Sequence, residues 1–310
     1  MRYLLAAEDP IEHILPHPLF KIGSLVVTNQ MFMALVAAGL MILIFTILFR
    51  KASSDAPSGA RNFFESILSF LREDVIRPAL KEHTDRFVPF LWTLFFFILF
   101  CNLLGQIPLA EIGLLVSGGR LRHVGGTATG NINTTGALAL CTLVMIHLSG
   151  VVQVARNLIS GTYGQHHAAP SHGKGMNLLL AIAASPFVYL WNFAPHPFKP
   201  EHGESVSKWV MDIPMWFALL VLELIGAVIK PFALMIRLFA NMIAGHLVLG
   251  VLIGLITLMP TIVGQIGIAI PVSVLALLIR VLELFVAFLQ AYIFTFLATL
   301  FIASAVAPEH

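Results

Sequence analysis

The sequence predicts an all-α, polytopic membrane protein with about five membrane-crossing helices, and composition, hydropathy and the length of its apolar runs carry that prediction. Of the 310 residues, 58% are hydrophobic and only 11% are charged, and the mean hydropathy is +0.90. Soluble domains of this size are not so apolar. Several apolar runs also reach the roughly 20 helical residues that cross a hydrocarbon core of about 30 Å.

Composition also argues against several kinds of partner and site. A net charge of +2 is too small to predict nucleic-acid binding, and the basic residues lie near the predicted membrane ends rather than in one patch. Cys101 and Cys141 both lie inside apolar runs, where a thiol is ordinarily a packing group. We therefore expect no nucleic-acid partner, no disulfide framework and no cofactor. Residues 1–10 lack the apolar core and small-residue cleavage site of a signal peptide, so we expect none to be removed.

The first part of the chain is predicted to be an outer segment, a membrane span and a surface helix. Residues 1–30 form the outer segment, and its prolines predict irregular structure over 1–28. The first span covers Met31–Phe49. Apolar and charged residues then alternate at helical spacing over 60–86, which predicts a helix that lies on the membrane surface.

Two further spans follow, so that residues 31–156 hold the first three. The second span is predicted at Phe87–Ile107 and the third at Thr134–Val154, with a glycine-rich loop between them. Basic residues concentrate in the connection between the first two spans, so the positive-inside rule places that connection in the cytoplasm and the N-terminus outside. These residues are Arg50, Lys51, Arg61, Arg72, Arg77, Lys81 and Arg86.

Residues 157–208 are predicted to be a polar loop that contains one apolar segment, 176–194. This segment is long enough to cross, but Pro186 and two asparagines interrupt it. A crossing would exchange the sides of the helices that follow, so we interpret it as interfacial or re-entrant. The loop also contains His166, His167 and His172, but no acid or cysteine stands at ligand spacing. A flexible loop is therefore favoured over a metal site.

Residues 209–310 are predicted to be a hairpin of two very long helices that carries the functional residues. A single helix over 209–258 would be about 75 Å long at 1.5 Å per residue, far more than a hydrocarbon core of about 30 Å. Each helix must therefore break or lie far over in the membrane. Pro231 offers a break, and Pro260 predicts the turn between the two helices.

Arg237, Asn241 and His246 stand inside the first helix of this hairpin. An arginine at the centre of a membrane helix costs roughly 2.5 to 3.5 kcal/mol on insertion scales, so it needs a partner or a water-filled cavity. Arg237 and Asn241 are four residues apart and share a helix face, whereas His246 points roughly 180° away. The helix therefore presents two polar positions.

Further polar residues accompany these positions. Glu283 and Gln290 are seven residues apart on one face of the last helix, and Glu223 and Lys230 have the same spacing on the helix before it. A structural ion pair is the plainer interpretation for Lys230 and Arg280 taken singly. Acids, a histidine and amides on facing helices are nevertheless the groups that a proton path needs, because each can exchange a proton or hold water.

Two stretches resemble a known family. RLFANMIAGH at 237–246 and VLELFVAFLQAYIFTFLATLFIASA at 281–305 are similar to the signature of subunit a of the F-type ATP synthase, and NLLGQIP at 102–108 and TGNINTTGALA at 129–139 also fit. The resemblance implies a non-catalytic, proton-conducting stator subunit of the Fo sector, with long tilted helices around a c-ring. Its implied partners are the c-ring, the peripheral stalk subunit b and the lipid bilayer. The implied location is a bacterial inner membrane, with the mitochondrial inner membrane as an alternative.

The resemblance also implies roles for individual residues. Arg237 matches the essential arginine that attracts the deprotonated c-ring carboxylate and separates two half-channels, and Asn241 and Gln290 match polar residues near it. His246 and Glu283 match the outer half-channel, in the order typical of mitochondrial and alphaproteobacterial members. The resemblance bears on two further positions. Glu223 matches an acid of the inner half-channel, and Gly105 departs from an aspartate found in some members.

Other function classes fit the sequence less well. A secondary transporter, in which Arg237 binds an anionic substrate, is the main alternative, but we find no internal repeat. An intramembrane serine protease would need a motif such as GxSxG, which does not occur. A haem protein would need axial histidines on two spans, for which His147 and His246 are the candidates. The sequence of this chain does not decide whether the transported ion is a proton or sodium, because the c-ring determines that selectivity.

Overall fold

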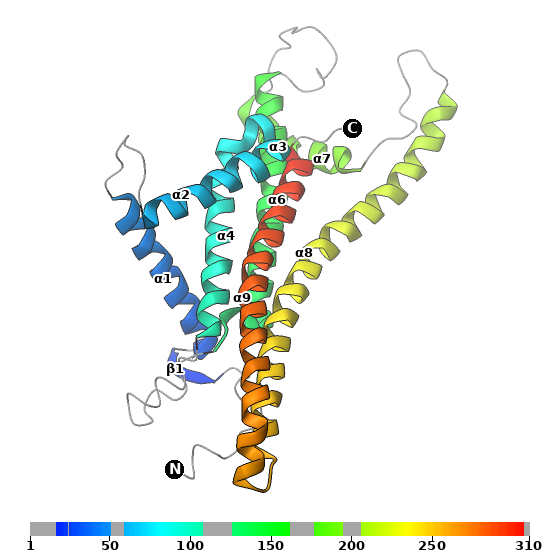
Figure 1. The fold of residues 1–310 in the computed structure, drawn as a ribbon. Coiled ribbons are helices and arrows are strands. Elements are labelled where there is room, and N and C mark those ends of the chain that lie inside the picture. The colour runs from blue at the N-terminus through cyan, green and yellow to red at the C-terminus, as the bar shows by residue number, and fades with distance from the viewer. Residues whose placement is uncertain are drawn as a thin grey trace.

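Five long apolar helices dominate the computed structural model, which describes residues 17–23, 25–50, 59–107, 126–161, 177–194 and 206–306 (Figure 1). Each is long and apolar enough to cross a membrane, which confirms the predicted class of polytopic helical membrane protein. They are α1 Asn29–Phe49, α4 Thr84–Gln106, α6 Ile132–Ser160, α8 Val206–Thr257 and α9 Ile262–Val306. All five were predicted, with ends within three residues of those observed except the end of α6, which lies six residues further on.

A short β-hairpin precedes α1, where the prolines predicted irregular structure. Strand β1 Pro18–Ile22 pairs antiparallel with β2 Leu25–Thr28, so the prediction is wrong for this part of 1–28. Pro18 is tolerated because it stands at the first position of a strand in a two-stranded sheet. Gly23 has a φ of 61°, which glycine adopts readily at the turn. The earlier prolines lie outside the described residues.

The predicted surface helix over 60–86 is present as a chain of short helical pieces. It comprises α2 Ala60–Phe70, a π-helical turn at Leu71–Ile76, α3 Arg77–Leu80 and a 3₁₀ turn at Lys81–His83, after which α4 begins. In Figure 1 these pieces lie across one end of α1 and α4 rather than alongside them. The segment is therefore placed as an interfacial helix would be, at one end of the bundle.

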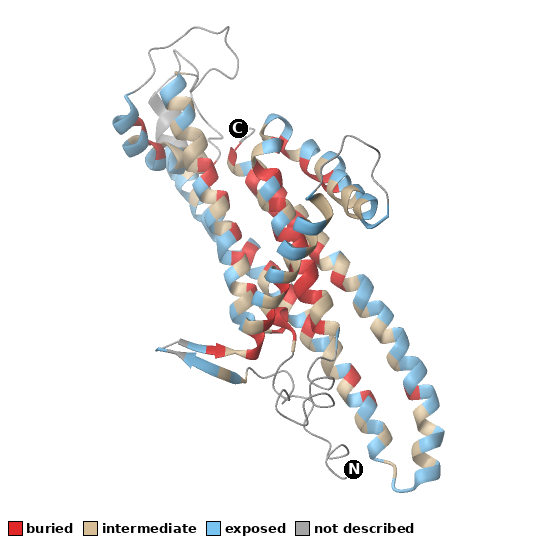
Figure 2. Ribbon diagram, turned by 90° about the vertical axis from the view of Figure 1, so that its left-hand side faces the viewer, coloured by how far each residue is buried: buried red, intermediate tan, exposed pale blue. Residues whose placement is uncertain are grey.

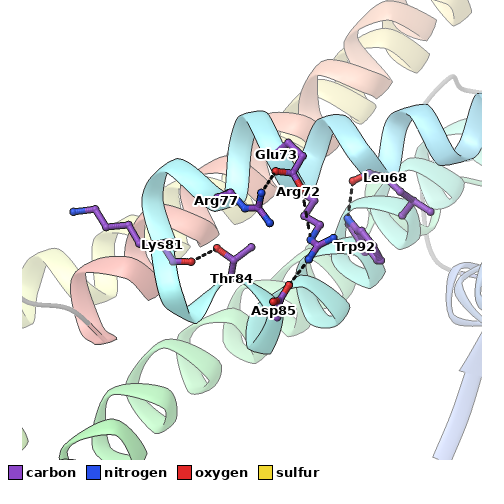
Figure 3. A network of polar contacts seen from close by, with 8 residues as sticks. All are labelled: Leu68, Arg72, Glu73, Arg77, Lys81, Thr84, Asp85 and Trp92. Carbon is purple, nitrogen blue, oxygen red and sulfur yellow. Dashed lines mark hydrogen bonds and ion pairs between the residues drawn. The ribbon is translucent and has the colours of Figure 1, made fainter.

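Polar contacts fix this surface segment to the start of α4 (Figure 3). The guanidinium of Arg72 donates from Nη2 to Oδ1 of Asp85 over 2.6 Å. The indole Nε1 of Trp92 donates to the carbonyl oxygen of Leu68 over 3.2 Å. Because both bonds join the surface segment to α4, the basic end of the molecule has a defined geometry.

The buried core centres on the contact between α4 and α9, with further residues from the surface segment, α1, α6 and α8, and Figure 2 shows the buried residues concentrated inside the bundle. On α9, Ala287, Ala291 and Ala298 are fully buried, so the helix presents a face of small residues to the bundle. Small residues let membrane helices approach closely, which favours packing without large side chains at the contact. The other side of α9 exposes large apolar residues, among them Leu282, Phe285 and Leu289.

Helices α8 and α9 form the long antiparallel hairpin that the sequence predicted, with Pro260 in the turn between them. α8 has 52 residues and continues through Pro214 and Pro231, so the proposed break at Pro231 is wrong. A proline is tolerated inside a membrane helix where neighbouring groups satisfy the freed carbonyl. At 1.5 Å per residue α8 is roughly 78 Å long, and a steep inclination in the membrane stays a prediction. In Figure 1 its first half diverges from the bundle and its second half lies along α9.

The short apolar helix α7, Leu178–Phe193, falls within the predicted segment 176–194 and packs against α6. Nδ1 of His147 lies 3.0 Å from the hydroxyl of Tyr189, so His147 makes a helix-to-helix contact. Trp216 on α8 donates to the carbonyl of Trp191 over 3.1 Å. α6 ends and α8 begins at the same end of the molecule (Figure 1), so α7 need not cross for the chain to connect them. This arrangement supports five crossings.

Candidate functional site

Arg237 lies on an exposed, apolar side of α8. The buried residues Leu234, Leu238 and Met242 recur at helical spacing and turn one face of α8 toward the bundle. Arg237 is exposed, beside the exposed side chain of Ile236. Within the described part of the chain its guanidinium has no hydrogen bond, ion pair or ring contact. A cation on a membrane-facing surface needs a partner, and here the partner must come from outside these residues.

Two contacts set the register of α8 against α9. A side chain at Gly245 would meet the carboxylate of Glu283, so these residues face each other. Nearer the other end of the hairpin, Nζ of Lys230 lies 5.3 Å from the centroid of the Phe301 ring. Gln290 lies between those levels, so this register brings it level with the turn of α8 that carries Arg237 and Asn241. Asn241 and Gln290 are half-buried and have no hydrogen-bond partner among the described residues.

Glu283 lies between two helices and is held by a residue that the sequence analysis did not assign to the site. Its Oε2 accepts from Nη1 of Arg280 over 3.2 Å, and only 15% of its side chain is exposed. Its Oε1 is the atom nearest to a Cβ built at Gly245, the residue before His246. Glu283 therefore lies against the turn of α8 that carries His246, and the proximity of the two side chains stays a prediction. The sequence could have indicated this partner, Arg280, because Arg280 and Glu283 are three residues apart and so are neighbours on one helix face.

Glu223 and Lys230, which were predicted to share one face of the helix, form an ion pair. Oε1 of Glu223 lies 3.7 Å from Nζ of Lys230, and both side chains are nearly half exposed. The carboxylate of Glu223 is also within electrostatic range of Tyr189 on α7, the residue that contacts His147. A chain of polar groups therefore connects α6, α7 and α8 at the end of the bundle that carries the basic residues.

A buried polar clamp joins the two stretches NLLGQIP and TGNINTTGALA. The amide Nδ2 of Asn102 on α4 donates to the carbonyl of Ala287 on α9 over 3.3 Å. Its Oδ1 accepts from the hydroxyl of Thr129, in the 3₁₀ turn η4 Ala128–Gly130, over 2.8 Å. Asn102 and Thr129 are fully buried, so this satisfied network fixes α9 one helical turn from Glu283.

We predict that enlarging Gly105 destabilises the protein. A Cβ at Gly105 would lie 2.9 Å from Cβ and 3.1 Å from Cα of Thr127, closer than side chains tolerate. Overpacking of this kind costs about 1 to 3 kcal/mol, so Gly105→Ala should lower the thermal midpoint of the purified protein. Gly39→Ala is the control, since the space around Gly39 in α1 is open. An equal midpoint for the two variants would contradict the predicted clash.

The same crowding would meet an aspartate at this position. Gly105→Asp would carry a larger side chain into the same contact with Thr127. Combining Gly105→Ala with Thr127→Gly removes the clashing side-chain atoms and should recover part of the lost midpoint.

Metal and haem chemistry find no support in the described ranges. No group of three or more histidine, cysteine or acidic side chains converges there in a way that could hold a metal ion. His166, His167 and His172 lie outside the described residues. Nδ1 of His147 is engaged by Tyr189.

Fold and site together define a class: an α-helical membrane protein that carries charged side chains inside its crossing helices, as ion-moving proteins do. Comparisons with known proteins narrow that class. The family model of the ATP synthase A chain matches residues 31–168 and 154–303. A protein from Chloroherpeton thalassium named ATP synthase subunit a is 36% identical over 287 residues, which are 91% of this chain and 67% of that protein.

Two further relatives agree. Proteins named ATP synthase subunit a from Anaeromyxobacter sp. and Myxococcus xanthus are 34% and 35% identical, over 90% and 84% of this chain. The matched residues make up 54% and 66% of those proteins, so the chain spans between about half and two thirds of the length of its relatives. All three relatives are bacterial, and none supports the mitochondrial alternative. The chain belongs to the ATP synthase A chain family.

Proposed function

We propose that this chain is the proton-conducting stator subunit, subunit a, of the Fo sector of a rotary ATP synthase in a bacterial inner membrane. In this proposal it forms two offset half-channels that deliver protons to, and remove them from, a carboxylate of the c-ring. The observation that carries the proposal is Arg237, a guanidinium on an exposed apolar helix face that has no partner among the residues the structure describes. Such a cation needs an anion from another protein, and a mobile carboxylate supplies one.

The chemistry required of Arg237 follows from its charge. A guanidinium keeps its proton in a low dielectric, so it attracts a deprotonated carboxylate and cannot itself relay a proton. A proton that approached it would meet a fixed positive charge. Arg237 can therefore separate two proton pathways while it lets a carboxylate pass, and Asn241 and Gln290 at the same level can hold water.

Titratable groups lie on both sides of Arg237. Glu223 precedes it on α8 by about 21 Å of helix, and His246 follows it by about 13 Å, at 1.5 Å per residue. Glu283 and His246 would serve the outer half-channel and Glu223 the inner one. The chain itself makes or breaks no covalent bond in this proposal, and ATP synthesis takes place on other subunits. Subunit b of the peripheral stalk would hold the chain still against rotation.

Cysteine cross-linking tests the proposed c-ring face. A cysteine at Ala240, exposed one turn from Arg237, should cross-link to the c subunit in membranes. A cysteine at Leu148 on α6, 56% exposed, serves as a control for an apolar face turned elsewhere. Exposed Cys141 is replaced beforehand. A product from position 148 and none from position 240 would place the c-ring on a different face.

The same proposal fixes the topology. The end of α1, the surface helix, the end of α6 and the start of α8 share one end of the molecule (Figure 1), which the positive-inside rule assigns to the cytoplasm. We predict that a cysteine near Glu201 reacts with a membrane-impermeant reagent only from the cytoplasmic side. Reaction only from the outside would mean that α7 crosses the membrane and that the chain has six crossings. The division into 1–30, 31–156, 157–208 and 209–310 stays a prediction.

A further inference from the structure

The charged residue Arg280 is not used by the function proposed so far. It and Glu283 are the two charged residues of α9, and they lie on one face of that helix, three residues apart. Nη1 of Arg280 donates to Oε2 of Glu283 over 3.2 Å and lies 3.4 Å from the carbonyl oxygen of Gln106 at the end of α4. Arg280 therefore connects the acid of α9 to a second helix.

The two carboxylate oxygens of Glu283 have different surroundings. Oε2 is occupied by Arg280, whereas Oε1 is directed at Gly245 on α8, next to His246. Gly245 leaves the space that this oxygen fills, because any side chain there would collide with it. One oxygen is thus fixed by a cation, and the other faces the histidine-bearing helix.

The other helices bring no competing charge to this level of the described structure. The charged residues of α4 and α6 are Asp85, Arg86 and Arg156, all toward the basic end of the bundle. At the Glu283 end, α4 offers the amides of Asn102 and Gln106, and the side-chain Nε2 of Gln106 is buried without a partner among the described residues. On α8, the titratable residue nearest in sequence to Gly245 is His246. Arg280 is therefore the fixed cation beside Glu283.

We propose that Arg280 is the counter-ion and positioning residue of Glu283 in the outer half-channel, an inference that rests on the proposed function. When the proton is absent, the guanidinium offsets the cost of a carboxylate in the membrane and holds Oε2. A proton then binds at Oε1, which faces α8, and leaves from the same oxygen. The step needs no other reactant, because the Glu283 carboxylate gains one proton and then loses it.

The pH profile of ATP-driven proton uptake in inverted vesicles tests the inference. Outward transfer requires Glu283 to lose its proton, and the positive charge of Arg280 favours the ionised form. Arg280→Gln should therefore move the low-pH limb of the profile toward alkaline pH by about one unit or more. In Arg280→Lys the adjacent carboxylate of Glu283 favours the charged ammonium, so this variant should shift the profile less than Arg280→Gln. Arg61→Gln, which removes the Arg61 partner of Glu65 in the surface helix, is the control and should not move the profile.

The Glu283→Gln background separates positioning from mere structure. If Arg280 acts through Glu283, Arg280→Gln should cause no further shift in that background. An unshifted profile for Arg280→Gln, or the same shift with and without Glu283, would overturn the inference. Wild-type pumping by Glu283→Gln would overturn the proposed role of Glu283 itself, which is a separate failure. The amount of the chain in each purified complex shows whether the variant assembles.

Discussion

Arg237→Ala is expected to stop ATP-driven proton uptake while ATP hydrolysis continues in the uncoupled complex. The guanidinium is exposed on an apolar face of α8 and unpartnered within the described chain, so its removal should leave the bundle intact. What is lost is the fixed charge that separates the half-channels. We therefore also expect passive proton leakage through the variant. Dye-monitored proton uptake, with hydrolysis measured on the same inverted vesicles, checks the prediction.

Arg237→Lys should be far worse than its retained charge suggests. A lysine can lose its proton in a low dielectric and offers a compact ammonium in place of a planar fork. Ile236→Ala is the matched control, because Ile236 is the exposed neighbour of Arg237 and carries no charge. Wild-type pumping in Arg237→Ala membranes would rule out the stator function, and loss of pumping in Ile236→Ala would show that the surface matters more than the charge.

The number and order of the crossing helices could be predicted because apolar run length has one main physical meaning in a bilayer. α1, α4, α6, α8 and α9 each fall on a predicted run. The ends were less accurate where helices extend beyond the apolar run. α6, predicted to end at Val154, continues to Ser160 and stops at Gly161, which has a φ of 71°. A glycine in the left-handed backbone conformation ends a helix, and a hydropathy profile does not report backbone conformation.

Local rules were less reliable where tertiary contacts compete with them. Proline predicted a break at Pro231 and irregular structure before α1, yet α8 continues and a β-hairpin forms. Pro231 is buried, where a neighbouring helix excludes solvent from the distorted turn. The two-stranded hairpin depends on pairing between separate segments, which no single stretch of sequence states.

Spacing within one helix predicted which residues share a face, but neither which of them pair nor how two helices are aligned. Glu223 and Lys230 stand two turns apart and were predicted to share a helix face, and the structure adds the ion pair between them. The register that places Gly245 against Glu283 depends on how α8 and α9 are aligned. The resemblance supplied the pairing of His246 with Glu283, but Arg280 has no role in that resemblance and was found from the geometry.

Exchanging His246 and Glu283 should restore activity that either single change removes. Glu283 lies against Gly245, the residue before His246, so an acid and an imidazole can share this place in either order. Removing either group should slow ATP-driven proton uptake, because the outer half-channel loses a relay, while the barrier at Arg237 persists. Glu283 should matter more, since it is the only acid on α9.

The double variant His246→Glu with Glu283→His reverses the positions of acid and base. It should pump faster than either single variant, although below wild type, because Arg280 is then beside a histidine and repels its protonated form. Adding Arg280→Gln to the double variant should therefore raise its rate further. Uptake is measured in inverted vesicles for the singles, the double and the triple, and normalised to assembled complex. A double variant no faster than the slower single would mean that the two residues do not form one functional site.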